Sequence, residues 1–312
     1  MVDNLSLVVP FYNEEEGIDF FSKTISSTLA KIPSSEWELI CVDDGSSDKT
    51  LQKLIDLSLS DSRFKVVELS RNFGKEAALT AGLDTASGAA VVVIDADLQD
   101  PAEIIATMVE KWREGAEVVL GRRIDRSSDS VAKRATASWF YSLHNRISKI
   151  KIPENVGDFR LMDRCVVDAL KTLPEQQRFM KGLFAWVGFR TVTVDYVRAP
   201  RVSGVTKFSP FSLWNFAIEG ITSFSTVPLR IWTYIGCTGA LLTLLYGIFI
   251  TLRTMIFGSA VPGYASIFFA ITLLGSVQII SVGILGEYIG RMYMETKNRP
   301  IYIRRKIYHR ID

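Results

Sequence analysis

The sequence has few of the residues that build disulfide frameworks or zinc sites. It contains 3 cysteines and 2 histidines in 312 residues, and Cys41, Cys165 and Cys237 lie far apart. A small, odd and widely spaced set of cysteines is typical of a reducing compartment and argues against a disulfide-stabilised fold. His144 and His309 belong to no motif, which indicates structural or surface positions.

The chain also lacks a strong charge of either sign. Its 36 Lys and Arg residues nearly balance its 34 Asp and Glu residues, so the net charge is +2. This balance argues against nucleic acid as a partner, because binding a polyanion needs an excess of basic side chains. Two nucleotide-binding signatures are missing as well. There is no G-x-x-x-x-G-K-[ST] P-loop, and no G-x-G-x-x-G dinucleotide turn follows the first predicted strand.

Charge is almost absent from one long region near the C-terminus. Between Ile231 and Gly286 the only charged side chain is Arg253. The segments 231–253 and 264–288 are each long enough to cross a bilayer as a helix. We therefore predict two transmembrane helices joined by a short turn. The alternative is a buried helical hairpin of a soluble domain.

The flanks of this region predict its orientation. Basic residues follow the second segment, namely Arg291, Lys297, Arg299, Arg304, Arg305, Lys306 and Arg310. The turn between the segments offers only Arg253, so the positive-inside rule places both chain ends in the cytoplasm. The apolar run at the N-terminus is too short for a signal peptide. We expect a multi-pass protein of the cytoplasmic membrane.

An amphipathic pattern precedes the first apolar segment. Phe211, Trp214, Ile218 and Ile221 recur at helical spacing. Such a face predicts an interfacial helix that lies on the membrane surface. A core helix of the preceding domain would have the same pattern and is the alternative.

The first two hundred residues alternate between strand and helix signals. Strands are predicted at 5–9, 37–42, 64–68, 89–94 and 118–120, and helices at 14–30, 49–58, 75–86 and 102–114. This alternation, with apolar strands, predicts an α/β domain whose sheet is mostly parallel.

Polar side chains follow each predicted strand. The fourth strand is followed by Asp95, Asp97, Gln99 and Asp100, with Asp100 and Pro101 placed to begin the next helix. The other strand ends are Pro10 to Glu14, Asp43 to Asp48, Ser70 to Lys75 and Gly121 to Arg123. Any one of these segments could be an ordinary turn. Because the carboxyl ends of parallel strands lie at one edge of the sheet, we expect these segments together to form a ligand pocket there. A D-x-D pair suits a divalent cation that also holds phosphate oxygens.

Five motifs in a fixed order carry a resemblance to a known family. VVPFYNE, VDDGSSD, RNFGKEAAL, DADLQDP and GDFRLMDR resemble family-2 glycosyltransferases with the GT-A fold. Within them the chain is similar to the polyprenyl-phosphate glycosyltransferases, which include bactoprenol glucosyltransferases and dolichol-phosphate mannose synthases. The resemblance covers essentially the whole chain. It implies a GT-A domain at 1–207, an interfacial helix at 208–228, a two-helix transmembrane hairpin at 229–290 and a basic cytoplasmic tail at 291–312.

The resemblance also implies roles for individual residues. The uracil and ribose of a UDP-sugar would be held by Pro10, Tyr12, Glu14, Asp43 and Asp44, with Arg71 and Lys75 approaching the nucleotide. Magnesium or manganese would be held by Asp95, Asp97 and Gln99. Asp158 would lie beside the sugar, and the acceptor phosphate would be held by Arg123, Arg134 and Ser138, together with Arg201 and Lys207 from a mobile loop. Asp97, Asp158 and Arg123 form the expected catalytic set.

The expected reaction is the transfer of one sugar from a UDP-sugar to undecaprenyl phosphate in a bacterial cytoplasmic membrane, metal-dependent and inverting. Glucose is preferred as the sugar, for O-antigen or other cell-surface glycan modification. A phosphate monoester is largely dianionic at neutral pH, so no general base is required. Gln176 to Phe179 does not match the Q-x-x-R-W of polymer synthases, which favours single transfer. The alternatives are another donor, such as mannose or a modified aminopentose, and a non-catalytic nucleotide-sugar-binding scaffold. The family suggests a homo-oligomer.

Overall fold

One sheet forms the centre of the protein. The computed structural model describes residues 3–33, 35–124, 156–176, 178–197 and 263–310, with short helical pieces between 234 and 257. Its strands are β1 (Asp3–Phe11), β2 (Ser35–Asp43), β3 (Phe64–Leu69), β4 (Ala90–Val93), β5 (Val118–Arg123), β6 (Val156–Asp163), β7 (Thr191–Tyr196) and β8 (Arg304–Tyr308). They lie in the order β7-β5-β6-β4-β1-β2-β3-β8.

The sheet is mostly parallel, as the sequence predicts. β1 pairs in parallel with β2 and β4, β2 with β3, and β5 with β7. β6 lies antiparallel between β4 and β5, and β8 lies antiparallel to β3. Among the described strands, all except β6 and β8 therefore run in one direction. The predicted strands correspond to β1 to β5, whereas β6, β7 and β8 were not predicted.

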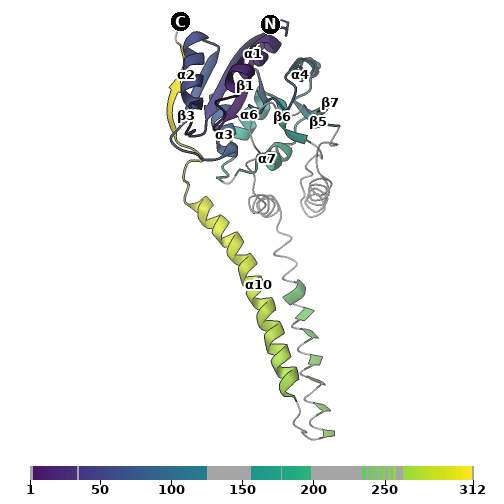
Figure 1. The fold of residues 1–312 in the computed structure, drawn as a ribbon. Coiled ribbons are helices and arrows are strands. Elements are labelled where there is room, and N and C mark those ends of the chain that lie inside the picture. Colours follow the sequence, from purple (N-terminus) through teal and green to yellow (C-terminus); the bar gives the residue numbers. More distant parts are fainter. Residues whose placement is uncertain are drawn as a thin grey trace.

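Helices cover both faces of the sheet (Figure 1). One face packs against α1 (Ile18–Leu29), α2 (Thr50–Ser60) and α4 (Ile104–Arg113). The other packs against α3 (Lys75–Thr85), α6 (Arg164–Lys171) and α7 (Met180–Trp186). The four helices predicted in this region correspond to α1 to α4. The arrangement confirms the α/β fold class.

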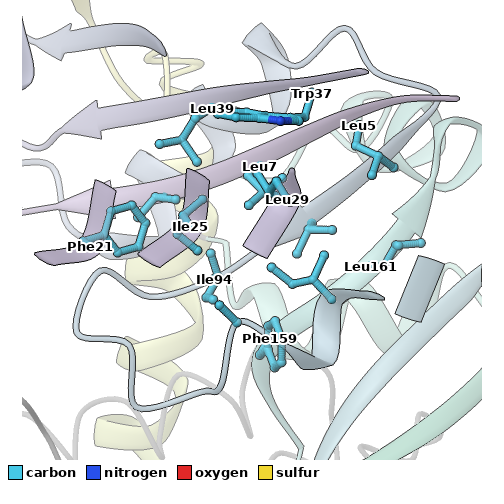
Figure 2. Close-up of a cluster of buried hydrophobic side chains, with 14 of the residues drawn as sticks. Leu5, Leu7, Phe21, Ile25, Leu29, Trp37, Leu39, Ile94, Phe159 and Leu161 are labelled. Atoms are coloured by element: carbon cyan, nitrogen blue, oxygen red, sulfur yellow. The ribbon is translucent and has the colours of Figure 1, made fainter. Parts of the chain in front are cut away.

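Apolar side chains fill the space between each helix layer and the sheet. Figure 2 shows Leu7 of β1 among Ile25 and Leu29 of α1. On the other face, α3 packs so closely on β1 that a Cβ at Gly82 would lie 2.2 Å from Cγ1 of Val8. Only glycine fits there, so the position of α3 relative to β1 is fixed.

The start of α4 corrects one prediction. The helix begins at Ile104 with Glu103 as its N-cap, and not at Pro101 with Asp100 as its cap. The Asp100 carboxylate instead accepts a hydrogen bond from the Tyr196 hydroxyl at 2.5 Å. The local pattern had predicted the Asp100 side chain as a helix cap, but this side chain bonds to a residue 96 positions away.

One long helix projects from this domain (Figure 1). α10 (Tyr264–Thr296) has 33 residues, a length of about 50 Å at 1.5 Å per residue. Among the described residues, its segment Leu273–Thr296 is the one helical stretch long and apolar enough to cross a bilayer. None of that stretch is buried against other parts of the protein. The helix confirms the predicted segment 264–288 as helical and continues beyond it. The predicted segments 208–228 and, for the most part, 231–253 lie outside the described residues.

The predicted basic tail is part of the sheet. After α10 the chain returns along the α/β domain, and β8 pairs with β3 and forms the edge of the sheet (Figure 1). Three of its five residues, Arg304, Arg305 and Lys306, are basic, which suggested a solvated tail. A charged sequence is also typical of an edge strand, where it discourages pairing with other molecules.

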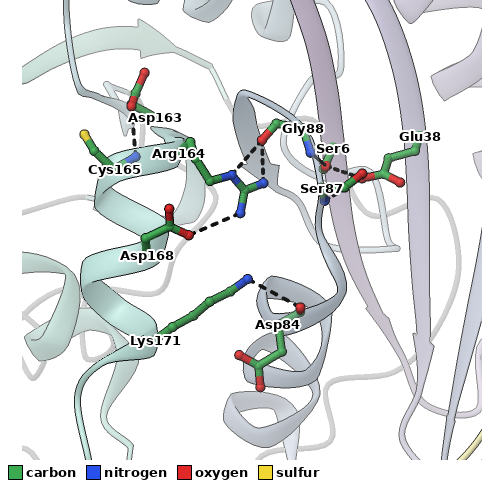
Figure 3. A network of polar contacts seen from close by, with 10 residues as sticks. All are labelled: Ser6, Glu38, Asp84, Ser87, Gly88, Asp163, Arg164, Cys165, Asp168 and Lys171. Carbon is green, nitrogen blue, oxygen red and sulfur yellow. Dashed lines mark hydrogen bonds and ion pairs between the residues drawn. The ribbon is translucent and has the colours of Figure 1, made fainter.

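A buried carboxylate links several segments at the end of the sheet where the parallel strands begin (Figure 3). Oε1 of Glu38 accepts hydrogen bonds from the Ser6 hydroxyl at 2.5 Å and from the Ser87 backbone N–H at 2.8 Å. Its Oε2 lies 2.5 Å from Nζ of Lys65. Burial opposes ionisation of Glu38, but these partners outweigh it and lower its pKa to about 2.

We predict that Glu38→Gln destabilises the protein at neutral pH. A carboxyl whose pKa is depressed by folding stabilises the fold above its unfolded pKa and loses that effect as the pH falls through its folded pKa. The melting temperature should therefore drop by about 5–10 °C at pH 7. This difference from the unmodified protein should shrink between pH 4.5 and pH 2, which a pH series of thermal melts measures.

Glu36→Gln provides the matched control, because Glu36 is an exposed residue of the same strand. A pH-independent difference, or equal effects at Glu36 and Glu38, would contradict the assignment.

Candidate functional site

The strand ends that carry polar residues meet at one edge of the sheet. β1 to β5 all run in the same direction, so their carboxyl ends lie together, as the sequence predicts. Because β6 is antiparallel to β4 and β5, its first residues lie at the same edge. This places Asp158, near the start of β6, between the ends of β4 and β5.

Lys75 connects two carboxylates at this edge. It is the first residue of α3, and its Nζ lies 2.7 Å from Oδ1 of Asp95 and 2.7 Å from Oδ2 of Asp158. Asp95 follows β4 and Asp158 lies in β6, so one ammonium group holds three elements together. Oδ1 of Asp158 is buried and has no hydrogen-bond partner among the described residues.

The charges in this cluster shift one another's pKa. Burial opposes ionisation of Asp158, but Lys75 and Lys181 outweigh it, so its pKa is well below the ordinary range. Burial also disfavours the charged form of Lys75, yet Asp158 and Asp95 raise its pKa. For Asp95 burial dominates and the pKa is raised. At neutral pH Asp158 is therefore an ionised carboxylate with one unpaired oxygen, a state that suits contact with a polar or positively charged ligand group.

Further ionisable groups surround Asp158. Burial and the Asp158 charge raise the pKa of Glu76 to about 8. Burial lowers the pKa of Arg160 to about 10, and its guanidinium lies 3.8 Å from the centre of the Phe184 ring. Arg160 and Lys181 also line a cavity of about 170 Å³ beneath α7. Sequence reasoning missed Glu76, Arg160 and Lys181, because an acid at a helix start and bases within apolar segments carry no local signal.

The loop after β2 is bound to the loop after β3. Asp44 accepts hydrogen bonds from the backbone N–H groups of Phe73 at 2.7 Å and Gly74 at 2.9 Å. Gly45 has a φ of +69°, and a Cβ there would lie 2.5 Å from the backbone of Arg71. The two loops are thus in backbone contact. Asp44, predicted to contact the nucleotide, positions the neighbouring loop in this structure.

Asp43 presents an unpaired oxygen at the end of β2. Its Oδ2 accepts a hydrogen bond from the Ser46 backbone N–H at 3.2 Å, while its Oδ1 is buried and has no partner among the described residues. Burial raises the pKa of Asp43, and the neighbouring Glu68 raises it further. A buried acceptor without a donor is costly for the fold and indicates a ligand that supplies the donor.

The end of β1 is fixed to the same loop. The Ser47 backbone N–H donates to Oδ1 of Asn13 at 2.8 Å, and Glu14 donates its backbone N–H to Oγ1 of Thr50 at 2.8 Å. Pro10 lies in β1, and Tyr12, just after it, is 39% exposed. Arg71 lies on the adjacent loop, where its guanidinium packs over the Phe73 ring. The residues predicted to contact the nucleotide therefore lie near one another, at the carboxyl ends of β1, β2 and β3.

The D-x-D segment forms a tight turn. The backbone N–H of Gln99 donates to Oδ1 of Asp97 at 3.2 Å, and Leu98 has a φ of +48° with its side chain buried in the core. Asp97 and Gln99 remain partly exposed at this turn. No three Asp, Glu, His or Cys residues within the described part of the chain come close enough to hold a metal. The Asp97 carboxylate and the Gln99 side-chain amide are oxygen donors of the kind that a hard cation takes, together with water and phosphate oxygens.

Arg123 lies at the end of β5 beside Asp100. Its Nη2 is 3.5 Å from Oδ1 of Asp100, and its Nε donates to the Tyr196 hydroxyl at 3.1 Å. Burial opposes the charge of Arg123, but Asp100 and Tyr196 outweigh it and raise its pKa. The Arg123 guanidinium is therefore a fixed positive charge at the carboxyl end of β5. Tyr196, which was not predicted, orients it. The predicted acceptor residues Arg134, Ser138, Arg201 and Lys207 lie outside the described residues.

Comparison with known proteins gives a family and close relatives. Residues 6–170 match the model described as Glycosyl transferase family 2. The chain is 54% identical over 303 residues to "Prophage bactoprenol glucosyl transferase homolog" of Escherichia coli K12, covering 97% of this chain and 99% of the relative. It is 54% identical over 299 residues to "Bactoprenol glucosyl transferase" of Shigella phage SfV, covering 96% and 97%.

A solved structure shares the fold. A mannosyltransferase from Pyrobaculum calidifontis, determined with GDP-mannose and Mn²⁺, superposes with a TM-score of 0.50 at 18% identity. The match covers 96% of this chain and 85% of the other. At this level of identity the likeness supports the GT-A-like α/β architecture.

We predict that Lys75→Met destabilises the protein because it removes the ammonium group that contacts both Asp95 and Asp158. The melting temperature at pH 7 should fall by about 5–10 °C. The loss should be smaller near pH 4, where protonation relieves the repulsion. The double variant Lys75→Met/Asp158→Asn should recover part of the stability.

Lys49→Met removes an exposed lysine at the start of α2 and serves as the control for a lost charge. Additive effects of Lys75→Met and Asp158→Asn in thermal melts would contradict a direct ion pair.

Proposed function

The chain belongs to glycosyltransferase family 2 and is a glycosyltransferase, and from this premise we propose that it transfers a single glucose residue from UDP-glucose to undecaprenyl phosphate. The observation that carries the proposal is 54% identity over nearly the full length to proteins named bactoprenol glucosyl transferases. Transfer would occur at the cytoplasmic face of a bacterial membrane and supply sugar for O-antigen or another surface glycan. The product would have inverted anomeric configuration.

The membrane segment supports a lipid acceptor. The exposed apolar part of α10 is suited to a bilayer, and the site edge belongs to the same chain. We propose that α10 and the segment 231–253 form the two-helix hairpin, with both chain ends in the cytoplasm. The segment 208–228 would lie at the headgroups, where a polyprenyl phosphate presents its charge. Assembly into a homo-oligomer would use these helices.

The donor would bind across the ends of β1, β2 and β3. The unpaired Oδ1 of Asp43 is suited to accept the N–H of the uracil ring, with Pro10, Tyr12 and Glu14 around it. Arg71 would approach the nucleotide from the neighbouring loop. Asp44 would act through the loop that it holds.

The sugar and diphosphate would lie near Lys75. Ionised Asp158, with its unpaired Oδ1, would orient a sugar hydroxyl or balance positive charge that develops at the anomeric carbon. Mg²⁺ or Mn²⁺, held by Asp95, Asp97 and Gln99, would stabilise the negative charge of the leaving UDP. Lys75 keeps Asp95 and Asp158 in place in this structure.

The acceptor phosphate would be held by cations from several segments. Arg123 is already oriented by Tyr196 and Asp100. Arg134, Ser138, Arg201 and Lys207 would complete this anion site. Since a phosphate dianion is a sufficient nucleophile, no carboxylate needs to act as a base. Another donor sugar would use the same chemistry and is the second candidate.

We predict transfer of radiolabel from UDP-[¹⁴C]glucose into an organic-extractable lipid when the purified protein is mixed with undecaprenyl phosphate. EDTA should reduce the transfer at least about tenfold, and Mg²⁺ or Mn²⁺ should restore it. A panel of UDP- and GDP-sugars identifies the donor. Absence of transfer from every donor, despite binding of UDP, would favour the non-catalytic scaffold.

We predict that Asp97→Asn abolishes transfer while the protein stays folded and membrane-bound. Asp97 is partly exposed, and an asparagine oxygen can still accept the Gln99 backbone N–H, whereas the negative charge would be needed to hold the cation. Thermal melts and the transfer assay separate the two effects. Asp56→Asn, at an exposed residue of α2, is the control. Turnover close to normal in Asp97→Asn would overturn the metal assignment.

A further inference from the structure

The C-terminal segment after α10 reaches the loop that follows β3. β8 pairs with β3 so that Tyr308 lies opposite Val66 and Lys306 opposite Glu68. Beyond the strand, the backbone N–H of Ser70 donates to the carbonyl of Ile303 at 2.9 Å. Ser70 begins the loop that contains Arg71 and leads to Lys75, the first residue of α3. The end of the chain is therefore bonded to a loop of the candidate site.

Two side chains of this segment bind one buried carboxylate. Nη1 of Arg305 lies 3.0 Å from Oε1 of Glu68, and the Tyr308 hydroxyl donates to Oε2 of Glu68 at 2.9 Å. Glu68 is 5% exposed. Both hydrogen bonds to this carboxylate among the described residues come from the C-terminal segment. Without them β3 would contain a buried charge with no partner, which is strongly unfavourable.

Glu68 in turn lies beside Asp43. The two residues are register partners in β3 and β2, and the negative charge of Glu68 favours the neutral form of Asp43. Arg305 offsets that charge. The position and charge of Glu68 therefore bear on the one carboxylate at the end of β2 that has an unpaired buried oxygen.

A groove links the same elements on the outside. It has a volume of about 630 Å³ and lies between α2 and β8. Ser46 and Asp48, from the loop after β2, line one part of it, and Arg305 and Tyr308 line another. Ser46 is also the residue that donates to Asp43. The C-terminal segment thus shares a groove with the loop after β2 and is hydrogen-bonded to the loop after β3.

Other contacts fix this segment to α10 and to the domain. The Glu295 carboxylate, in the last turn of α10, accepts the Gln176 backbone N–H at 3.0 Å. The Tyr302 hydroxyl donates to Oδ2 of Asp84, at the end of α3, at 2.8 Å. The path from the long apolar helix to β3 is therefore held at successive points.

We propose that residues 302–308 form part of the donor nucleotide site, with Arg305 and Tyr308 as positioning residues that act through Glu68 on Asp43 and through Ser70 on the loop 70–75. The apolar helix α10 is thereby coupled to donor binding through the segment 302–308. This inference rests on the proposed function for the identity of the donor. It requires that a change at the far C-terminus alters donor affinity more than chemistry.

The test compares Arg305→Ala with Arg304→Ala in the full-length protein. Arg304 has the same charge one residue earlier in the strand and lies opposite Leu69 rather than Glu68. Arg305→Ala should raise KM for UDP-glucose about threefold to tenfold, because Arg305 acts on the donor through Glu68, with kcat and the KM for undecaprenyl phosphate unchanged. Arg305→Lys should recover part of the affinity, and Arg304→Ala should behave as the unmodified enzyme.

Tyr308→Phe and titration with UDP keep the test independent of folding and of turnover. Tyr308→Phe removes one hydroxyl and should weaken donor binding in the same direction. If the unmodified enzyme fails to transfer glucose, the proposed function fails, and UDP affinity alone decides the positioning role. Equal UDP affinity in Arg305→Ala and Arg304→Ala would overturn the inference. A fall in kcat with unchanged donor KM would overturn it as well.

Discussion

The contact of Lys75 with Asp95 and Asp158 is the constraint on which the site depends. The two carboxylates come from β4 and β6, which are neighbours in the sheet, and the lysine comes from the first residue of α3. Two ionised carboxylates at this separation repel each other strongly in a partly buried setting. One ammonium group converts that repulsion into attraction, and so fixes how α3 meets the sheet edge.

Buried carboxylates lie at both ends of the parallel strands, and they differ in whether each oxygen has a partner. At the edge where the parallel strands begin, both oxygens of Glu38 have partners. At the other edge, Asp43 and Asp158 each keep one buried oxygen without a partner among the described residues. Satisfied carboxylates stabilise a fold, whereas unsatisfied ones retain the capacity to bind. At that end Asp44 and Glu68 have partners for both oxygens, so the capacity to bind rests there on individual oxygens such as those of Asp43 and Asp158.

The sequence was sufficient for the parts of the fold that depend on local pattern. Apolar strands such as Ala90–Val93 and the alternation with helices predicted β1 to β5, α1 to α4 and the common edge. β6 was missed because Asp158 and Arg160 interrupt its apolar pattern with charges that are buried only in the assembled site. β8 was missed because its basic residues resemble a solvated tail.

In the site too, local pattern predicted some features and missed others. Lys75, Asp95 and Asp158 were among the predicted site residues, whereas Glu76, Arg160, Lys181 and Tyr196 were not. The pairings were not predicted either, because Lys75 and Asp158 lie 83 positions apart and Tyr196 and Asp100 lie 96 apart. No local pattern indicates which charge a buried aspartate will meet. Asp100 is the example, since its place before a proline predicted a helix cap and its contact with Tyr196 excluded one.

The pairing of β8 with β3 has a consequence for how the chain matures. β8 is the last strand in the sequence and follows α10. During synthesis β3 has an open edge until the long apolar helix has left the ribosome and the final residues have returned to the domain. An open edge is a template for wrong pairing, and larger domains are most vulnerable to it before they are complete. β8 therefore covers the edge of β3, and this side of the sheet is complete only after the apolar helix has been made.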